Sequence, residues 1–437
     1  MSVDLYTRPD DLLQHLIRFE STNPPGKEGD CIHFIDDLLH EAGIETTILA
    51  KDSNRPNIIA RLKGNGNAAP LLLYGHVDVV PVTGQRWTHP PFSAEIHDGY
   101  IWGRGTLDMK GAVTMMLCAF IQAHVEQWAL PGDVILCIVS DEEVGGIYGA
   151  RFLVEEHAHL FDGVRYALGE FGGFTSFLGG KRFYPIMVTE KQCCGIRATL
   201  RGASGHGSNP IRGGAMAKAA RMLAALDQKH LPVHITEPTK LMIDAYSAAL
   251  VDTVGPFLQL LLDPAQTDAI IEGMGDQGRV FYPLLHNTVS PNIIRGGDAM
   301  NVIPPEVTVD FDVRILPGLT LEDFMEELRT LVGDEPELEI TYFDAGSSRV
   351  DMGMFDLLGT ILCEANPEAI PTPLVLPAVT DGRFFARLGI QTYGFTPMQL
   401  AEDFNFGDTI HAADERIPVG AVGFGARMIG EVLRRFS

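Results

Sequence analysis

Short apolar runs alternate with helix-like stretches along the first half of the chain. The runs at 57–62, 71–74 and 134–139 have the length of buried strands, and a long helical pattern over 110–127 separates the last two. Strands that alternate with helices form a mostly parallel sheet with helices packed on its faces. The sequence therefore predicts an α/β fold with a mostly parallel central sheet.

A different order, β-α-β-β-α-β, begins after about Pro185. It is made of expected strands and helices at 195–200, 214–226, 292–295, 307–314, 321–331 and 337–342. This order predicts a small α+β, ferredoxin-like domain inserted into the chain. Because 437 residues exceed one ordinary core, we expect a larger domain at 1–187 and 347–437 and the inserted domain at 188–346.

Acidic side chains outnumber basic ones, 57 to 33, and give a formal net charge of −24. A surface of this sign disfavours nucleic acid and anionic membranes as partners. The start of the chain lacks a basic and apolar leader, and no apolar run is long enough to span a bilayer. The six cysteines form no CxxC pair, which is typical of reduced thiols. We therefore expect a cytoplasmic protein with no nucleic-acid or membrane partner.

His76 and Asp78 stand in the segment YGHVDVVP, where the apolar run at 71–74 ends. Alternate residues of a strand share one face, and a metal-binding histidine needs its second ring nitrogen held by a carboxylate or carbonyl. Asp78 is suited to hold His76 in this way. The alternative is an ordinary histidine at the edge of the core.

Three acidic residues, Asp141, Glu142 and Glu143, follow the apolar run at 134–139 in the segment SDEEVGG. Ligands of open α/β sheets bind at the carboxyl ends of the strands. Carboxylates this close repel each other unless cations neutralise them. The segment therefore predicts a cation site, with a solvated acidic turn as the alternative.

Three further segments carry one candidate ligand each. Asp108 ends the glycine-rich loop GRGTLDMKG, where it is either a ligand or the N-cap of the next helix. Glu170 lies in YALGEFGG and His411 in GDTIHAADERIPV. Each is uninformative alone, but a pair of divalent ions needs a bridging carboxylate and about two further ligands for each ion. The set His76, Asp108, Glu143, Glu170 and His411 fills that scheme and leaves Glu142 free as a base.

These segments, in this order, resemble the dinuclear zinc exopeptidase and deacylase family. That family includes acetylornithine deacetylase, succinyl-diaminopimelate desuccinylase, aminoacylase, carboxypeptidase S and glutamate carboxypeptidase. The resemblance extends from about residue 10 to the C-terminus. It implies two divalent ions per subunit, with zinc as the expected metal and cobalt or manganese as alternatives. It also implies a homodimer formed through the inserted lid domain.

The resemblance also implies a role for each residue. It assigns the metal ligands as Asp108 for the bridge, His76 and Glu170 for one ion, and Glu143 and His411 for the other. Asp78 orients His76, Glu142 is the general base, and the peptide bond between Asp108 and Met109 is expected to be cis. These assignments define a metallopeptidase or amidohydrolase site.

Four further residues are expected around the substrate. In GASGHGSNP, the resemblance implies that His206 reaches the active site of the partner subunit and stabilises the oxyanion. Asn301 and Arg314 are candidates for substrate contacts, and for Arg314 a structural ion pair within the lid is the alternative. Arg383 in AVTDGRFF falls where relatives bind a free substrate carboxylate, a role that suits a bidentate guanidinium; the alternative is a surface arginine.

The expected activity is hydrolysis of the amide bond of N-acyl amino acids or small peptides with a free C-terminal carboxylate. A dipeptidase or aminopeptidase of the same family is the main alternative. A non-catalytic binding protein or an assembly subunit on this fold is another. Two departures from the family pattern leave the substrate open: the long helical insertion at 235–285, and Gly169 where many relatives carry an acid.

Overall fold

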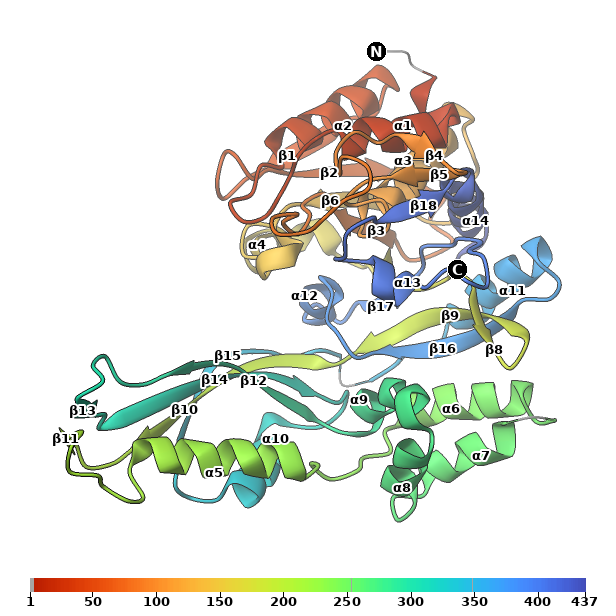
Figure 1. Ribbon diagram of the computed structural model, residues 1–437. Coiled ribbons are helices and arrows are strands. Elements are labelled where there is room, and N and C mark those ends of the chain that lie inside the picture. Colours follow the sequence, from red (N-terminus) through yellow and green to blue (C-terminus); the bar gives the residue numbers. More distant parts are fainter. Residues whose placement is uncertain (1–3, 253, 348) are drawn as a thin grey trace. The chain divides into compact units, whose positions relative to one another are not determined.

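The computed structural model describes residues 4–252, 254–347 and 349–437. Residues 1–3, 253 and 348, which the expected domain ranges include, lie outside the described residues. The chain divides into two compact units (Figure 1). The larger unit consists of Met1–Val188, Val350–Leu374 and Thr380–Ser437, and the inserted unit of Thr189–Arg349 and Val375–Val379. The short return of Val375–Val379 to the inserted unit was not part of the expected division.

The larger unit is built on a sheet with the strand order β1-β2-β6-β3-β7-β17-β9-β16. Its strands are β1 (Thr46–Leu49), β2 (Asn57–Leu62), β3 (Leu71–His76), β6 (Val134–Val139), β7 (Tyr166–Gly169), β8 (Ser176–Leu178), which pairs with β9 (Lys181–Glu190), β16 (Ile370–Leu376) and β17 (Gln391–Gly394). The central strands β6, β3, β7 and β17 run parallel, and β1, β2 and β9 pair antiparallel. The predicted α/β class with a mostly parallel sheet is confirmed.

Strand β16 was not predicted. Pro371 and Pro373 interrupt its apolar pattern, and a proline cannot donate to a β-ladder. The structure places this strand at the end of the sheet order. An edge strand has a neighbour on one side only, so the backbone groups on its other side need no partner strand. The prolines therefore hide the strand from sequence reasoning and also fit its edge position.

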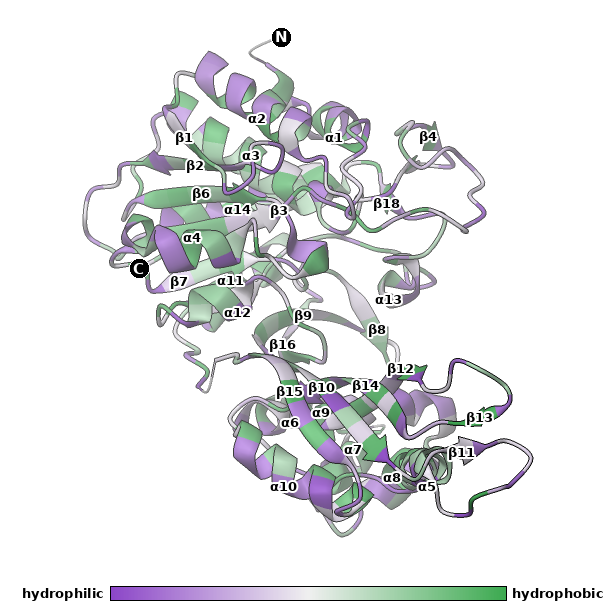
Figure 2. Ribbon diagram, turned by 90° about the vertical axis from the view of Figure 1, so that its left-hand side faces the viewer, coloured by the Kyte–Doolittle hydropathy of each residue, from purple (hydrophilic) through white to green (hydrophobic). Residues whose placement is uncertain are grey.

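Alternate residues of the central strands enter different cores. Leu71 and Leu73 of β3 pack in one hydrophobic cluster, and Leu72 and Tyr74 pack in the other. The first cluster contains side chains from α1 (Pro9–Ile17), α2 (Gly29–Glu41), α3 (Lys110–Val125), α11 (Phe355–Ala365) and α14 (Ala421–Arg435); the second contains side chains from α4 (Ala150–Glu156) and α12 (Gly382–Ala386). Helices therefore cover both faces of the sheet (Figure 2), which explains why β3 and β6 are buried along their whole length.

Smaller elements complete the larger unit. They are the strands β4 (Ile96–His97), β5 (Tyr100–Trp102) and β18 (Arg416–Pro418), which form a separate sheet, the helix α13 (Phe406–Thr409), and the 3₁₀ turns η1 (Leu5–Thr7), η2 (Glu142–Val144) and η3 (Ala158–Phe161). In the part of the chain that the structure describes, no helix is long and apolar enough to cross a membrane.

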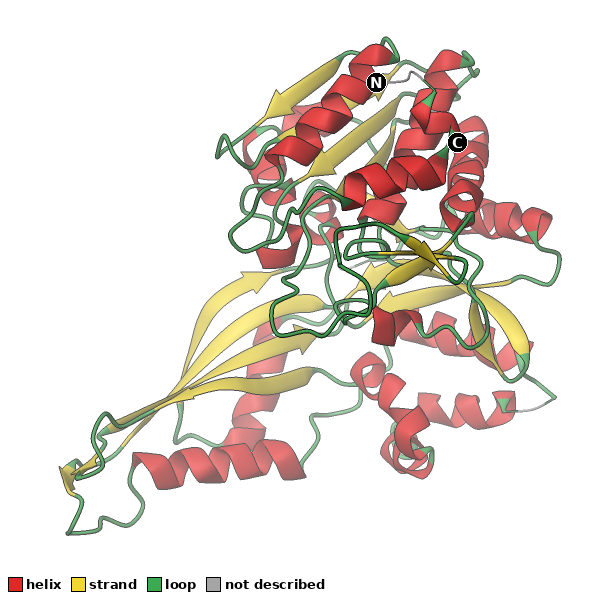
Figure 3. Ribbon diagram, turned by 45° about the horizontal axis from the view of Figure 1, so that its top comes forward, coloured by secondary structure: helices red, strands yellow, loops and turns green. Residues whose placement is uncertain are grey.

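The inserted unit contains an antiparallel sheet in the order β12-β14-β10-β15 with helices on one face (Figure 3). Its elements follow the chain as β10 (Gln192–Arg201), α5 (Ala215–Gln228), β12 (Thr288–Arg295), β14 (Glu306–Ile315), α10 (Leu321–Val332) and β15 (Glu337–Asp344). Burial alternates along β14, as expected for a strand with one face on the core. The predicted β-α-β-β-α-β, ferredoxin-like order is confirmed.

The remaining elements of the inserted unit are additions to this order. A short ribbon pairs β11 (Gly205–His206) with β13 (Val302–Ile303). Between α5 and β12 lie α6 (Glu237–Ala249), α7 (Gly255–Gln259), η4 (Leu260–Leu262), α8 (Thr267–Gly273), η5 (Gly275–Val280) and α9 (Tyr282–Leu285). The Thr236 hydroxyl caps α6 by accepting from the N–H of Thr239, and Pro238 lies in its first turn.

Candidate metal centre

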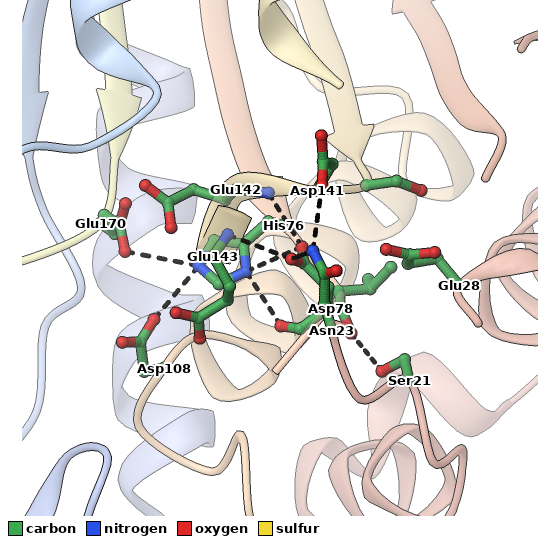
Figure 4. A network of polar contacts seen from close by, with 12 residues as sticks. Ser21, Asn23, Glu28, His76, Asp78, Asp108, Asp141, Glu142, Glu143 and Glu170 are labelled. Carbon is green, nitrogen blue, oxygen red and sulfur yellow. Dashed lines mark hydrogen bonds and ion pairs between the residues drawn. The ribbon is translucent and has the colours of Figure 1, made fainter. Parts of the chain in front are cut away.

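Three of the candidate ligands come from the carboxyl ends of neighbouring parallel strands. His76 ends β3, Glu143 follows β6, and Glu170 comes directly after β7. Because β3 pairs in parallel with both β6 and β7, these ends meet at one edge of the sheet. The fold therefore brings together side chains that are far apart in the sequence (Figure 4).

Asp108 lies between two groups of ligand atoms. Its Oδ1 is 3.1 Å from Nε2 of His76, and its Oδ2 is 3.0 Å from Nε2 of His411. Oε2 of Glu170 lies 3.5 Å from the same His76 nitrogen, and Oε2 of Glu143 lies 3.3 Å from the same His411 nitrogen. The ligand atoms thus form two triads that share the carboxylate of Asp108.

Two carboxylates at this centre, those of Glu143 and Glu170, each have one oxygen without a partner in the described part of the chain. Oε1 of Glu143 and Oε1 of Glu170 are buried and have no hydrogen-bond partner among the described residues. Burial and the neighbouring Asp108 charge raise the pKa of Glu143 to about 8, and burial together with Glu142 raises the pKa of Glu170. Buried carboxylates with unused oxygens, gathered around two imidazoles, are the donor set of a divalent-cation site. The residues present therefore fit a pair of metal ions.

The buried carboxylate of Asp78 has a wider role than the sequence indicated. Nδ1 of His76 lies 3.0 Å from the backbone oxygen of Asp78 and 3.4 Å from its carboxylate. The carboxylate also accepts hydrogen bonds from the backbone N–H groups of Glu142 and Glu143 and from the side chain of Asn23 (Figure 4). Asp78 therefore holds both the histidine and the acidic turn after β6.

Asp141, the first of the three consecutive acids, points away from the ligand triads. Its carboxylate accepts hydrogen bonds from Asn23 and from the N–H of Tyr148, and it lies 2.9 Å from the guanidinium of Arg55. Its backbone is left-handed, with φ of 73°, so the chain turns sharply before Glu142. The predicted repulsion among the three acids is thus relieved partly by Arg55, a residue that the sequence did not single out.

The loop that carries Asp108 is held by Glu415. This buried carboxylate accepts hydrogen bonds from the N–H groups of Gly105 and Leu107 and pairs with Arg104 at 2.6 Å. Asp108 itself makes no capping bond to α3, whose N-cap is Met109, so the N-cap alternative is wrong. The expected cis peptide bond between Asp108 and Met109 is present.

The family model for Peptidase family M20/M25/M40 matches residues 72–435. This range contains both triads and Glu142. The chain belongs to this family. It is accordingly a hydrolase of amide bonds, and the predicted family and enzyme class are confirmed.

Curated relatives of this M20 chain carry several names. A probable carboxypeptidase S-like 2 of Dictyostelium discoideum is 27% identical over 369 residues, which cover 80% of this chain and 68% of the relative. The N-fatty-acyl-amino acid synthase/hydrolase PM20D1 of Homo sapiens is 27% identical over 378 residues, with coverages of 84% and 74%. The succinyl-diaminopimelate desuccinylase of Hydrogenovibrio crunogenus is 27% identical over 416 residues, 93% of each chain.

Solved structures share the fold of this M20 chain over nearly its whole length. The M20 family metallo-carboxypeptidase Sso-CP2 from Sulfolobus solfataricus aligns with a TM-score of 0.71 and 18% identity, covering 99% of both chains. A dinuclear metal-binding peptidase from the M20 family of Bacillus subtilis aligns with a TM-score of 0.61 and 15% identity, covering 99% of this chain and 98% of that one.

Glu142 of the M20 chain lies beside the triads, and neither contains it. Burial, first of all, raises the pKa of its carboxyl group. Arg383 lies 3.7 Å from Oε1 of Glu142 and donates to the carbonyl of Thr380. Arg383 is 4% exposed, so its alternative interpretation as a surface arginine is wrong.

Asp381 is a buried acid two residues before Arg383, and the sequence did not single it out. Neither of its carboxylate oxygens has a hydrogen-bond partner among the residues described. Burial, together with the charge of Glu142, raises the pKa of Asp381 well above its ordinary range. The segment AVTDGRFF was noted for its arginine, and nothing in the sequence marked the aspartate as buried.

The other three candidates lie in the inserted unit of the M20 chain. His206 is exposed on β11, and its Nδ1 accepts hydrogen bonds from the N–H and hydroxyl of Ser208. Its Nε2 therefore carries the proton of the neutral ring. Asn301 is exposed and its backbone oxygen accepts from Gly207. Arg314 pairs with Asp312 at 2.8 Å, which is the structural ion pair that the sequence left open.

Proposed function

We propose that this chain is a dinuclear zinc hydrolase that releases an amino acid from N-acyl amino acids or small peptides with a free C-terminal carboxylate. One observation carries the proposal: the two oxygens of Asp108 each face a different histidine, at 3.1 Å and 3.0 Å. A single carboxylate placed in this way is the bridge that a two-metal centre requires. The names of the carboxypeptidase-like, acyl-amino-acid and desuccinylase relatives agree with this substrate class.

The proposed ligands are His76 and Glu170 for one ion, Glu143 and His411 for the other, and Asp108 for both. Bound there, zinc, or cobalt or manganese in its place, would polarise the substrate carbonyl and lower the pKa of a shared water. The buried oxygens of Glu143 and Glu170 that lack hydrogen-bond partners support this assignment.

Glu142 is the proposed general base. It is buried beside the triads and belongs to neither of them, so its carboxylate remains available for proton transfer. It would take the proton of the attacking water and deliver it to the leaving nitrogen of the amide.

The substrate-binding roles complete the proposal. Arg383 would bind the free carboxylate of the substrate, and its position 3.7 Å from Glu142 would fix the scissile bond near the base. The protonated Nε2 of His206 would donate to the oxyanion in the partner subunit of a homodimer. We assign the larger unit as the catalytic domain and the inserted unit as the lid and dimerisation domain. In the lid, Asn301 and Arg314 are the proposed substrate contacts. The proposed compartment is the cytoplasm.

A hydrolysis screen tests the proposal. Chelator-treated protein reloaded with zinc, cobalt or manganese would be assayed on N-acyl amino acids, on their C-terminal amides and on dipeptides with free or acetylated amines. We expect cleavage that needs the metal and the free carboxylate. A requirement for a free substrate amine would instead favour the dipeptidase or aminopeptidase alternative, and absence of any metal-dependent cleavage would favour a binding protein.

A substitution at Arg383 tests the carboxylate role within the same screen. Arg383→Lys keeps the positive charge but loses the bidentate geometry. We expect a raised KM for substrates with a free carboxylate and little change of KM for their C-terminal amides. Equal changes for both substrates would remove Arg383 from the carboxylate site.

A further inference from the structure

A second group of metal-ligating side chains lies in the inserted unit, and nothing in amide hydrolysis uses it. His230 follows α5, Asp268 lies in the first turn of α8, and His286 follows α9. The helices α8 and α9 belong to the green insertion in Figure 1. One ligand atom from each residue lies within 4.8 Å of those of the other two.

The buried ring of His286 has a defined tautomer. Its Nδ1 lies in hydrogen-bonding geometry 3.2 Å from the backbone oxygen of Tyr282. A carbonyl only accepts hydrogen bonds, so Nδ1 carries the proton. With Nδ1 protonated in the neutral imidazole, Nε2 is an acceptor. The Nε2 lone pair then faces the carboxylate of Asp268.

This arrangement leaves two acceptors facing each other. Nε2 of His286 lies 3.0 Å from Oδ1 of Asp268, and Nδ1 of His230 lies 3.7 Å from the same oxygen. Both Nε2 of His286 and Oδ1 of Asp268 are buried, and within the described residues neither has a hydrogen-bond partner. A cation resolves this conflict, because two ligand atoms bound at about 2.0–2.1 Å to one zinc ion are separated by roughly 3 Å.

We propose that His230, Asp268 and His286 bind one divalent cation of the zinc class, separate from the dinuclear centre. Two imidazoles and a carboxylate are ligands that suit zinc and its first-row neighbours. The hydrogen bond from Nδ1 of His286 to a carbonyl is the outer-shell contact that metal-binding histidines make. His230 and Asp268 are each about half exposed, which leaves a coordination position open to water.

The proposed ion joins three separate segments of the inserted unit. It ties the chain leaving α5 and the start of α8 to the short segment between α9 and β12. Bound metal stabilises a fold because the unfolded chain lacks the preformed site. The ion would therefore hold the helical insertion against the ferredoxin-like sheet of its own unit.

A comparable cluster in the larger unit does not carry the same argument. His89, Glu95 and His97 also bring ligand atoms together. There, however, Nε2 of His97 is hydrogen-bonded to Glu95 at 2.9 Å, and both side chains are well exposed. No buried acceptor is left facing another, so the cluster needs no cation.

Zinc counting tests the proposal on the full-length chain. The variants are His230→Ala and Asp268→Ala, at two half-exposed positions, with Glu272→Ala on the same helix α8 as the matched control. Each protein would be equilibrated at the same buffered free Zn²⁺, passed through gel filtration, and analysed for zinc per chain by mass spectrometry. Circular dichroism would verify that each variant is folded.

We expect His230→Ala and Asp268→Ala each to hold one zinc fewer per chain than the wild type and Glu272→Ala. Zinc should also raise the thermal unfolding temperature of these two variants less than that of the control. Equal zinc content in all four proteins would overturn the proposal. The test compares the zinc content of the variants with that of the control, so its outcome is independent of what the dinuclear centre binds or catalyses.

Discussion

The backbone N–H of Glu143 donates a hydrogen bond of 3.1 Å to the carboxylate of Asp78. The N–H of Glu142 donates to the other oxygen of the same carboxylate at 3.2 Å. A residue expected only to orient His76 thus also fixes the turn that presents the proposed base and one proposed ligand. The positions of the proposed base Glu142 and of the proposed ligands His76 and Glu143 therefore depend on one buried side chain.

Substitution of Asp78 should weaken both metal binding and catalysis. Asp78→Asn replaces one acceptor oxygen by a donor that faces N–H groups, so the turn at Glu142 and Glu143 must shift. We expect metal affinity to fall about 10- to 100-fold, together with kcat. Titration against a competing chelator measures the affinity, and Asp37→Asn on the exposed face of α2 is the control. An unchanged affinity in Asp78→Asn would show that the turn is held by other contacts.

Glu142 and Glu143 should respond differently when each is replaced by glutamine. Glu142→Gln removes the proposed base without removing a proposed ligand, so we expect normal metal content and a kcat lower by about 10²–10⁴-fold. Glu143→Gln is the matched comparison and should lose metal from the centre. Metal analysis and steady-state kinetics on both variants separate the roles. Near-normal turnover of Glu142→Gln would exclude it as the base.

The stability of the metal-free chain should fall as the pH rises. In the folded chain the pKa of Glu143 is raised from 4.5 to about 8 by burial and the Asp108 charge, and pairing with Asp108 and Glu143 raises the pKa of His411 from 6.5 to about 10. At pH values between the ordinary and the raised pKa values, the folded state then binds more protons than the unfolded state. The contribution of Glu143 and His411 to folding stability is therefore complete below their ordinary pKa values and is lost as the pH rises through their raised pKa values.

Thermal unfolding of chelator-treated and zinc-loaded protein over this pH range measures the effect. The loaded ligands are already deprotonated, so the zinc-loaded chain should lack this decline. A metal-free chain whose unfolding temperature is constant or rises between about pH 4.5 and pH 8 would contradict the prediction.

His206 should act across a subunit boundary. Its Nε2 carries the proton because Nδ1 accepts from Ser208, so His206→Ala should lower kcat and leave metal content unchanged. Mixing the impaired His206→Ala and Glu142→Gln chains in equal amounts, with subunit exchange, should raise turnover to about a quarter of the wild-type value, since half of the dimers then contain one complete site. No recovery in a mixture shown to exchange subunits would place His206 outside the partner's site.

The sequence alone predicted the α/β sheet, the inserted β-α-β-β-α-β order and the family. These rest on local signals: the apolar runs that became β3 and β6, and short segments in which His76, Asp108 and Glu143 stand beside glycines and strand ends. Such patterns are readable because strand periodicity and turn chemistry are properties of neighbouring residues.

The tertiary structure decided which buried groups support those residues. Arg55 compensates Asp141, and Glu415 holds the loop of Asp108 from the far end of the chain. Asp268 and His286 face each other only because the helical insertion folds back on itself. No local pattern marks these pairs, because burial and long-range charge pairing are set by which distant segments pack together.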